Sequence, residues 1–297
     1  MTEPASVETF DSCSYAKPQI GMATEYADVL GVRVSAVNMD FAVRMADQWI
    51  SSGKPGYACV TAVHSVVEAQ NDPGFLGILN GAVLNVPDGM PITWVGRFQG
   101  HREMDRVFGP DFMLALCKLS VERGYRNFLY GGQPGVAEQL RTALVMRFPG
   151  LQIVGTCTPP FRPLNLHEAE ELVGLVRELR PDIIWVGLGA PKQERFMAHY
   201  FEQLQVPLMV GVGAAFDFHT GRIRDCSDWI KRAGLQWLHR LMQDPRRLWK
   251  RYLRTNPEFL WRIAWQLSGL QKSRENRKRI QEDLSREEGS ETRTGAS

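Results

Sequence analysis

From about residue 57 the chain alternates short apolar runs with longer amphipathic stretches. The apolar runs predict strands at residues 57–62, 128–130, 153–155, 183–187 and 208–212. The amphipathic stretches predict helices at residues 65–70, 112–123, 136–148, 165–179 and 193–204, of which the fourth begins with a capping box formed by Asn165 and Glu168. Alternation of this kind is typical of βαβ crossovers. It predicts an α/β fold, a Rossmann-like parallel sheet with helices on both faces.

The two ends of the chain break this alternation. Residues 1–27 and 271–297 are polar and weakly periodic, so we expect both to be disordered. Residues 28–221 form the predicted α/β core, and residues 222–270 form a predicted C-terminal helical appendage. Within the appendage, Pro245 and the pair Asn256-Pro257 are expected to interrupt the helix, with Asn256 capping a new one.

Composition narrows the class of protein. The 297 residues are 44% hydrophobic and 23% charged, which excludes collagen, wholesale disorder and disulfide miniproteins. The five cysteines form no CxxC pair, so neither a disulfide framework nor a zinc site is expected, and a reducing cytosol fits best. The sequence also shows no secretory signal and no apolar run long enough to span a bilayer.

Charge separates the appendage from the core. The net charge is +2, but residues 222–265 carry +7 and the remainder therefore carries −5. Five of the eight tryptophans also lie in the appendage. Basic residues beside Trp and Leu are typical of a helix in the interface of an anionic membrane. The alternative is an ordinary amphipathic helix that covers the core with its charges in water.

Ligands of open parallel sheets bind beyond the carboxyl ends of the strands, so the loops there hold the candidate residues. Asp88, in Pro87-Asp88-Gly89-Met90-Pro91, is held by turn-forming neighbours and is a candidate general base, or else it makes an Asx-turn. Gly131 and Gly132 precede a predicted helix and could let a phosphate approach the backbone, although a tight βα turn explains them equally well.

Three more side chains are candidates for binding a phosphate or diphosphate. Lys192 and Gln193 stand in the first turn of a predicted helix, where free amides and the helix dipole favour an anion. Arg106 precedes another helix and either clamps a phosphate or pairs with a nearby acid. The sequence contains no GxGxxG, DxD, HExxH or GxSxG motif, so no cofactor and no metal are predicted.

Seven segments, taken in order, resemble the bacterial WecG/TagA/CpsF glycosyltransferase family over about residues 29–253. They are VTAVHSVVEA, PDGMP, RVFGPDFM, YGGQPGVAE, VGLGAPKQERFM, VGVGAAFDFHTG and LQWLHRLMQDPRRLWKRYL. The resemblance implies an inverting, metal-independent hexosyltransferase that moves a sugar from a UDP-sugar to a polyprenyl-diphosphate-linked saccharide. Such enzymes serve exopolysaccharide, capsule and cell-wall polymer synthesis, and the resemblance implies a peripheral location on the inner face of the cytoplasmic membrane.

The same resemblance assigns roles to individual residues. Asp88 matches the family's general base, and Arg106 and Gln193 match its site residues. Basic residues near Pro245 match an appendage that completes the site over the diphosphate, and here they are Arg240, Arg247 and Lys250. Many members carry T-x-N at the end of the first strand, whereas this chain has Thr61-Ala62-Val63-His64. With His64 aligned, the resemblance implies that Ala62 replaces the Asn, so Thr61 and His64 are the candidates to take over its contact.

The sequence leaves several alternatives open. The donor sugar could be N-acetylmannosamine, its uronic acid, glucose or another hexose, and the acceptor saccharide and oligomeric state are not fixed. The expected partners are a UDP-sugar, the lipid-linked acceptor, an anionic membrane surface and, as an option, further copies of the chain, but not nucleic acid. A nicotinamide-dependent oxidoreductase and a noncatalytic membrane scaffold are the competing classes.

Overall fold

The computed structural model describes residues 25–269, apart from the side chains of Asp228 and Arg247. The predicted disorder of residues 1–24 and 271–297 lies outside this range, and so does Leu270 of the predicted appendage. Residues 25–27, which were also predicted to be disordered, include the start of a strand, because β1 (Tyr26–Val29) pairs antiparallel with β2 (Val32–Ser35) in a short hairpin.

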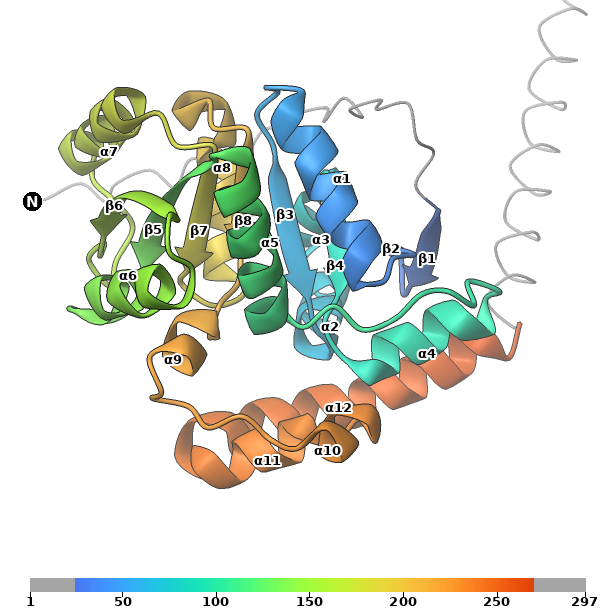
Figure 1. The fold of residues 1–297 in the computed structure, drawn as a ribbon. Coiled ribbons are helices and arrows are strands. Elements are labelled where there is room, and N and C mark those ends of the chain that lie inside the picture. The colour runs from blue at the N-terminus through green and yellow to red at the C-terminus, as the bar shows by residue number, and fades with distance from the viewer. Residues whose placement is uncertain (1–24, 270–297) are drawn as a thin grey trace, which may run out of the picture.

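A six-stranded parallel sheet forms the centre of the molecule (Figure 1), in the order β4-β3-β8-β7-β5-β6. Its strands are β3 (Tyr57–Thr61), β4 (Leu84–Pro87), β5 (Arg126–Gly131), β6 (Gln152–Cys157), β7 (Ile183–Gly187) and β8 (Leu208–Gly211). The five predicted strands are confirmed, and each predicted end lies within two residues of the observed one. The sixth strand, β4, lies at an edge of the sheet, and the apolar pattern did not reveal it.

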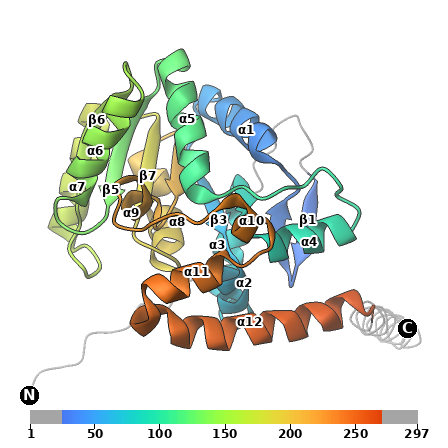
Figure 2. The same cartoon turned by 60° about the horizontal axis from the view of Figure 1, so that its bottom comes forward.

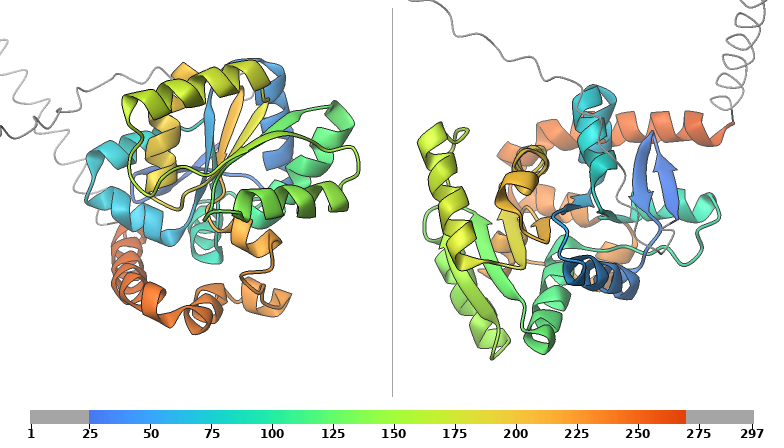
Figure 3. Two further views of the ribbon diagram at one scale, coloured as in Figure 1. Left: turned by 90° about the vertical axis from the view of Figure 1, so that its left-hand side faces the viewer. Right: turned by 90° about the horizontal axis from the view of Figure 1, so that it is seen from above.

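Helices cover both faces of the sheet (Figure 3), as predicted. One face packs against α1 (Met39–Ser51), α5 (Gly109–Arg123), α6 (Val136–Arg147) and α9 (Ala215–His219). The other packs against α2 (Val63–Gln70), α3 (Pro73–Gly81), α4 (Met90–Phe98), α7 (Leu166–Leu179) and α8 (Lys192–Leu204).

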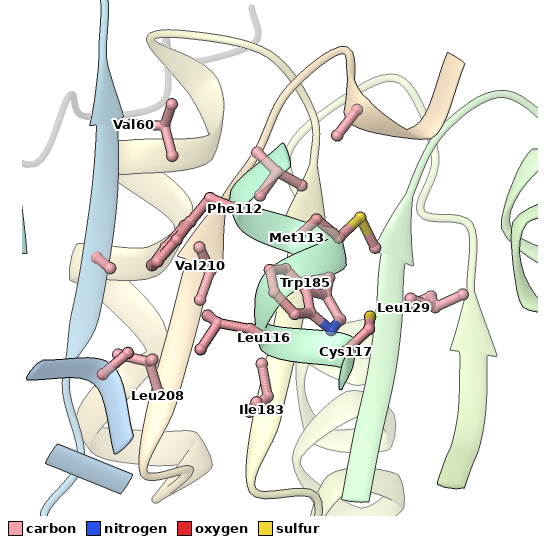
Figure 4. Close-up of a cluster of buried hydrophobic side chains, with 14 of the residues drawn as sticks. Val60, Phe112, Met113, Leu116, Cys117, Leu129, Ile183, Trp185, Leu208 and Val210 are labelled. Atoms are coloured by element: carbon pink, nitrogen blue, oxygen red, sulfur yellow. The ribbon is translucent and has the colours of Figure 1, made fainter. Parts of the chain in front are cut away.

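The strands supply both cores because successive side chains point to opposite faces. In β7, Ile183 and Trp185 pack on the α5 side, and Ile184 and Val186 pack on the α8 side. Figure 4 shows Trp185 among apolar side chains of α5 and the neighbouring strands. Its indole N–H donates to Asn127 Oδ1 at 2.9 Å, so the one polar atom of this buried ring is satisfied.

Local signals in the sequence explain where several helices begin and end. The predicted capping box is present, since the Asn165 side chain accepts from the Glu168 amide and the Glu168 side chain accepts from the Asn165 amide. Gly124 closes α5 in the left-handed conformation at φ 74°, as predicted. These caps satisfy amides and carbonyls that a helix end leaves free.

The appendage consists of α10 (Asp228–Arg232), α11 (Gln236–Gln243) and α12 (Pro245–Leu267), which lie across one end of the core (Figure 2). Pro245 does separate two helices, but the predicted break at Asn256-Pro257 is wrong, because α12 continues through Pro257. Proline removes one backbone hydrogen bond there. Burial of Phe259 and Ile263 beside α2 holds the following turns in register. None of the helices within residues 25–269 is long and apolar enough to cross a bilayer.

Candidate active site

A cavity of about 710 Å³ opens at the carboxyl ends of the sheet strands. Loops after β3, β4, β5, β6, β7 and β8 line it, as expected for an open parallel sheet. The appendage contributes Arg240 from α11 and Leu248 and Arg251 from α12. The core and the appendage therefore both line one cavity.

Asp88 lies in the wall of this cavity, directly after β4. Its amide donates to the Thr61 carbonyl at 2.8 Å, which ties the loop to the neighbouring strand β3. Gly89 follows at φ 131°, a conformation that glycine adopts most readily. Burial raises the pKa of Asp88, Arg106 and Arg240 oppose this rise with their positive charges, and Asp111 adds slightly to it. The carboxyl group is thus a stronger base than an exposed one.

Arg106 connects Asp88 to the appendage. Its Nη2 lies 3.7 Å from Asp88 Oδ1, an ion-pair distance, and also donates to the side-chain oxygen of Gln236, at the start of α11. The guanidinium carbon lies 4.3 Å from the centroid of the Phe108 ring, and only 10% of the side chain is exposed. The alternative that Arg106 pairs with a nearby acid is therefore confirmed, and that acid is Asp88.

The candidates on and after β3 have different environments. His64 lines the cavity, and burial lowers its pKa to about 3, with the charges of Arg251 and Arg240 adding to the effect. It is therefore a neutral imidazole at physiological pH. Thr61 is buried and is not part of the cavity lining, and its hydroxyl has no hydrogen-bond partner among residues 25–269. Ala62 lines the cavity with only a methyl group.

The two predicted glycines of the β5 loop also differ. Gly132 lines the cavity, but its amide donates to the Gly187 carbonyl at 3.1 Å and is therefore already used. Gly131 is not part of the cavity lining. A Cβ atom there would stand 2.7 Å from the backbone of Gly187, so close packing of β5 against β7 explains this glycine. For Gly131, a tight βα turn is therefore a better explanation than a backbone that a phosphate approaches.

Gln193 lines the cavity although its side chain is almost completely buried. Its Oε1 accepts from the Gly189 amide at 3.2 Å, and its Nε2 donates to Glu194 at 2.9 Å. Lys192 lies outside the lining, and its Nζ is 4.1 Å from the centroid of Phe161, an exposed ring at the cavity rim. Lys192 can therefore reach a ligand only from the rim.

The three basic candidates of the appendage do not share one position. Arg240 lines the cavity, whereas Lys250 is exposed on the outer face of α12, with its Nζ 5.6 Å from the Trp249 ring centroid. The side chain of Arg247 lies outside the part of the chain that the structure describes. Lys250 therefore does not lie in the cavity, and its exposure suits a surface contact.

Arg251 and Asp217 line the cavity and were not among the predicted site residues. The break between α11 and α12 changes the helical phase at Pro245, so spacing from Arg240 could not show which basic residue of α12 faces inward. Asp217 stands in residues 211–218, a segment rich in apolar residues and glycine that is typical of core packing, so its pattern did not mark it as a site residue. Within residues 25–269, no group of three or more His, Cys, Asp or Glu side chains is arranged to hold a metal ion.

Comparison with known proteins places this chain in a family. The model of the glycosyl transferase WecG/TagA/CpsF family matches residues 27–273. The chain is also similar to two proteins named N-acetylglucosaminyldiphosphoundecaprenol N-acetyl-beta-D-mannosaminyltransferase. The protein of Bacillus subtilis (strain 168) is 26% identical over 185 residues, which are 62% of this chain and 70% of the relative. That of Bacillus spizizenii (strain W23) is 25% identical over 213 residues, which are 72% and 80%. Because the family match spans most of the chain, this protein is a glycosyltransferase and belongs to the WecG/TagA/CpsF family.

Proposed function

We propose that this protein transfers a hexose from a UDP-sugar to a saccharide carried on a polyprenyl diphosphate, with inversion at the anomeric carbon and without a metal ion. One observation carries the proposal: Asp88, Arg106, Arg240 and Arg251 lie in or beside one cavity, and the core supplies the acid while the appendage supplies two of the cations. A single base and several cations are the groups that direct displacement of a diphosphate requires.

In this mechanism Asp88 accepts the proton of the acceptor hydroxyl as its oxygen attacks the anomeric carbon. The bond from that carbon to the diphosphate breaks, and UDP leaves with the electron pair. Arg240 and Arg251 stabilise the charge that develops on the leaving group, with Arg106 holding its place beside the base. Gln193 contacts the donor from the sheet side, and Lys192 reaches it from the rim. The neutral imidazole of His64 supplies a hydrogen bond to one of the sugars.

The outer face of α12 gives this enzyme a membrane-facing surface. The exposed side chains follow one stripe of the helix, while Leu248, Tyr252, Phe259 and Ile263 are buried on the opposite side. The stripe contains Arg246, Trp249, Lys250, Leu253, Arg254, Leu260, Trp261 and Trp265. Its first half is basic and its second half is apolar, as in a helix that lies in a lipid interface. A lipid-linked acceptor would then reach the cavity from the membrane plane.

The names of the two relatives suggest the substrates. Both are named as transferring N-acetyl-β-mannosamine to N-acetylglucosaminyldiphosphoundecaprenol, so we propose the same acceptor type for this chain. The donor is left broader, because Ala62 replaces an amide side chain by a methyl group in the cavity wall. N-acetylmannosamine, its uronic acid and glucose are the first donors to test.

The test is release of UDP by the purified protein from a panel of UDP-sugars, with and without N-acetylglucosamine-diphosphoundecaprenol in detergent. We expect acceptor-dependent release from one donor, a product of inverted anomeric configuration by NMR, and an unchanged rate after treatment with EDTA. Absence of release from every UDP-sugar, or a product with retained configuration, would contradict the proposal. Loss of activity in EDTA that added Mg²⁺ or Mn²⁺ restores would contradict its metal independence.

A further inference from the structure

Glu194 is a buried acid that the proposed chemistry does not use. Only 1% of the residue is exposed, and its Oε2 has no hydrogen-bond partner among residues 25–269. Its Oε1 accepts from Gln193 Nε2 at 2.9 Å. Burial raises the pKa of Glu194 to about 7, while the hydrogen bond from Gln193 opposes this rise. A buried carboxyl group destabilises a fold unless its partners compensate, so its bond to a residue in the cavity wall calls for an explanation.

The Gln193 carboxamide is held from both sides. The Gly189 amide donates to Oε1, and Glu194 accepts from Nε2. The glycines of the β8 loop leave room for this group, because a Cβ atom at Gly211 would stand 3.1 Å from Nε2. A Cβ atom at Gly213 would stand 3.5 Å from Oε1. The cavity wall is therefore shaped around one placement of this side chain.

A carboxamide has nearly the same shape when its oxygen and nitrogen are exchanged, so its partners decide which atom lies where. At Gln193 a donor on one side and a carboxyl group on the other select a single orientation. Nε2 has two hydrogens, and the bond to Glu194 uses one of them. The other can be offered to a ligand in the cavity that Gln193 lines.

We propose that Glu194 is a positioning residue that holds the Gln193 carboxamide with an N–H group directed at the nucleoside diphosphate of the donor. The inference rests on the proposed use of a UDP-sugar. Glu194 itself does not touch the ligand, and its effect passes through Gln193. Removing it frees the carboxamide to rotate and to present oxygen to an anion, which repels the ligand instead of binding it.

A double-mutant cycle with UDP as the probe tests this inference. Calorimetry would give the Kd of UDP for the wild type, Gln193→Ala, Glu194→Ala and the double variant. We expect each single variant to weaken binding by about tenfold and the double variant to be no weaker than Gln193→Ala alone, because both changes remove the same contact. Glu194→Gln should stay within about threefold of the wild type, since its side-chain oxygen can accept from Gln193.

Three outcomes would overturn the inference. If Glu194→Ala binds UDP as the wild type does, Glu194 has no positioning role. If the two single losses multiply in the double variant, Glu194 acts through general loosening of the fold and not through Gln193. If the wild type itself does not bind UDP, the proposal that a UDP-sugar is the donor is contradicted, and so is this inference. In the steady state, Glu194→Ala should raise the KM for the donor by about tenfold with kcat within about threefold.

Discussion

The core and the appendage contribute to one cavity by different physical means. The core buries its strands on both faces, and the backbone of these strands fixes the loop that carries Asp88. In contrast, α11 has no buried residue at all, and α12 packs through a narrow line of side chains near α2. Beyond this line, polar links attach the appendage to the core, from Arg106 to Gln236 and from Gln266 to the backbone of Asp28 and Leu30.

This difference separates the roles of charge in the two regions. The core places an acid, whose position depends on strand geometry. The appendage places cations, whose position depends on the few contacts that attach the appendage to the core. Changes to the appendage cations should therefore alter catalysis with little effect on folding, whereas changes to buried polar groups of the core should alter the stability of the fold. Four experiments test this difference between the core and the appendage.

The largest effect is expected at the acid of the core. Asp88→Asn should lower kcat by about 10²–10⁴-fold, the usual contribution of a general base, and leave thermal unfolding close to that of the wild type. Asp217→Asn is the matched control, because Asp217 is the other carboxylate in the cavity lining within residues 25–269. We expect it to affect binding more than kcat. If Asp217→Asn abolishes transfer and Asp88→Asn does not, the base is Asp217.

The fold was largely predictable because its signals are local or periodic. Alternating apolar and amphipathic segments predicted five strands and the helices between them, and the pair Asn165 and Glu168 marked a helix start. Several elements in the first half of the core were not predicted, among them the strands β1, β2 and β4. Strand β4 has only four residues and ends in Pro87, and β1 and β2 are equally short. Such segments become strands through pairing with neighbours that are distant in the sequence.

The candidate site was predictable mainly where a residue follows a predicted strand. Gly132 and Gln193 follow strands that the apolar pattern predicts, so their place at the carboxyl edge could be predicted, and they line the cavity. Asp88 also lines it, but it follows β4, which the pattern did not reveal, and it became a candidate through its turn-forming neighbours and the family resemblance. The inward-facing residue of α12 could not be predicted, because the direction of that helix depends on how it packs beside α2. For the same reason Pro257 was misread, since tertiary burial outweighs the local cost of a proline.

The second largest effect concerns the buried acid of the core. The pKa of Glu194 is raised by burial from 4.5 to about 7, so the folded protein takes up a proton that the unfolded chain lacks between these values. Stability should therefore fall as pH rises through this window. Glu194→Gln has no carboxyl group to ionise there, so its stability should not fall in this window. Its free energy of unfolding, relative to that of the wild type, should therefore rise by about 2 kcal/mol between pH 5.5 and 8.5.

Urea unfolding at several pH values would measure this advantage. Glu202→Gln is the control, because Glu202 is an exposed acid on the same helix. The difference in the free energy of unfolding between Glu202→Gln and the wild type should not change with pH. An advantage of Glu194→Gln that is the same at pH 5.5 and 8.5 would show that the carboxyl group does not titrate in this window.

The third effect is expected at the appendage cations. Arg240→Ala and Arg251→Ala should each lower kcat by about 10–100-fold, because charged hydrogen bonds to the leaving diphosphate contribute about 1.5–3 kcal/mol. Arg254→Ala is the matched control, since Arg254 is exposed on the outer face of α12, away from the cavity. In detergent it should retain the wild-type kcat. Equal losses in all three variants would show that net charge matters and not the inward position.

The smallest effect is expected on the outer stripe of α12. Trp261 and Trp265 are exposed, and their rings are stacked with centroids 6.3 Å apart. Replacing both by Ser should weaken binding to vesicles with anionic lipid by about tenfold, because apolar area leaves the interface while the basic half of the stripe remains. In detergent kcat should stay unchanged, because neither ring lines the cavity. If vesicle binding persists unchanged, the membrane contact lies elsewhere. If kcat in detergent falls, α12 supports the cavity along its whole length, and the separation of roles between core and appendage does not hold.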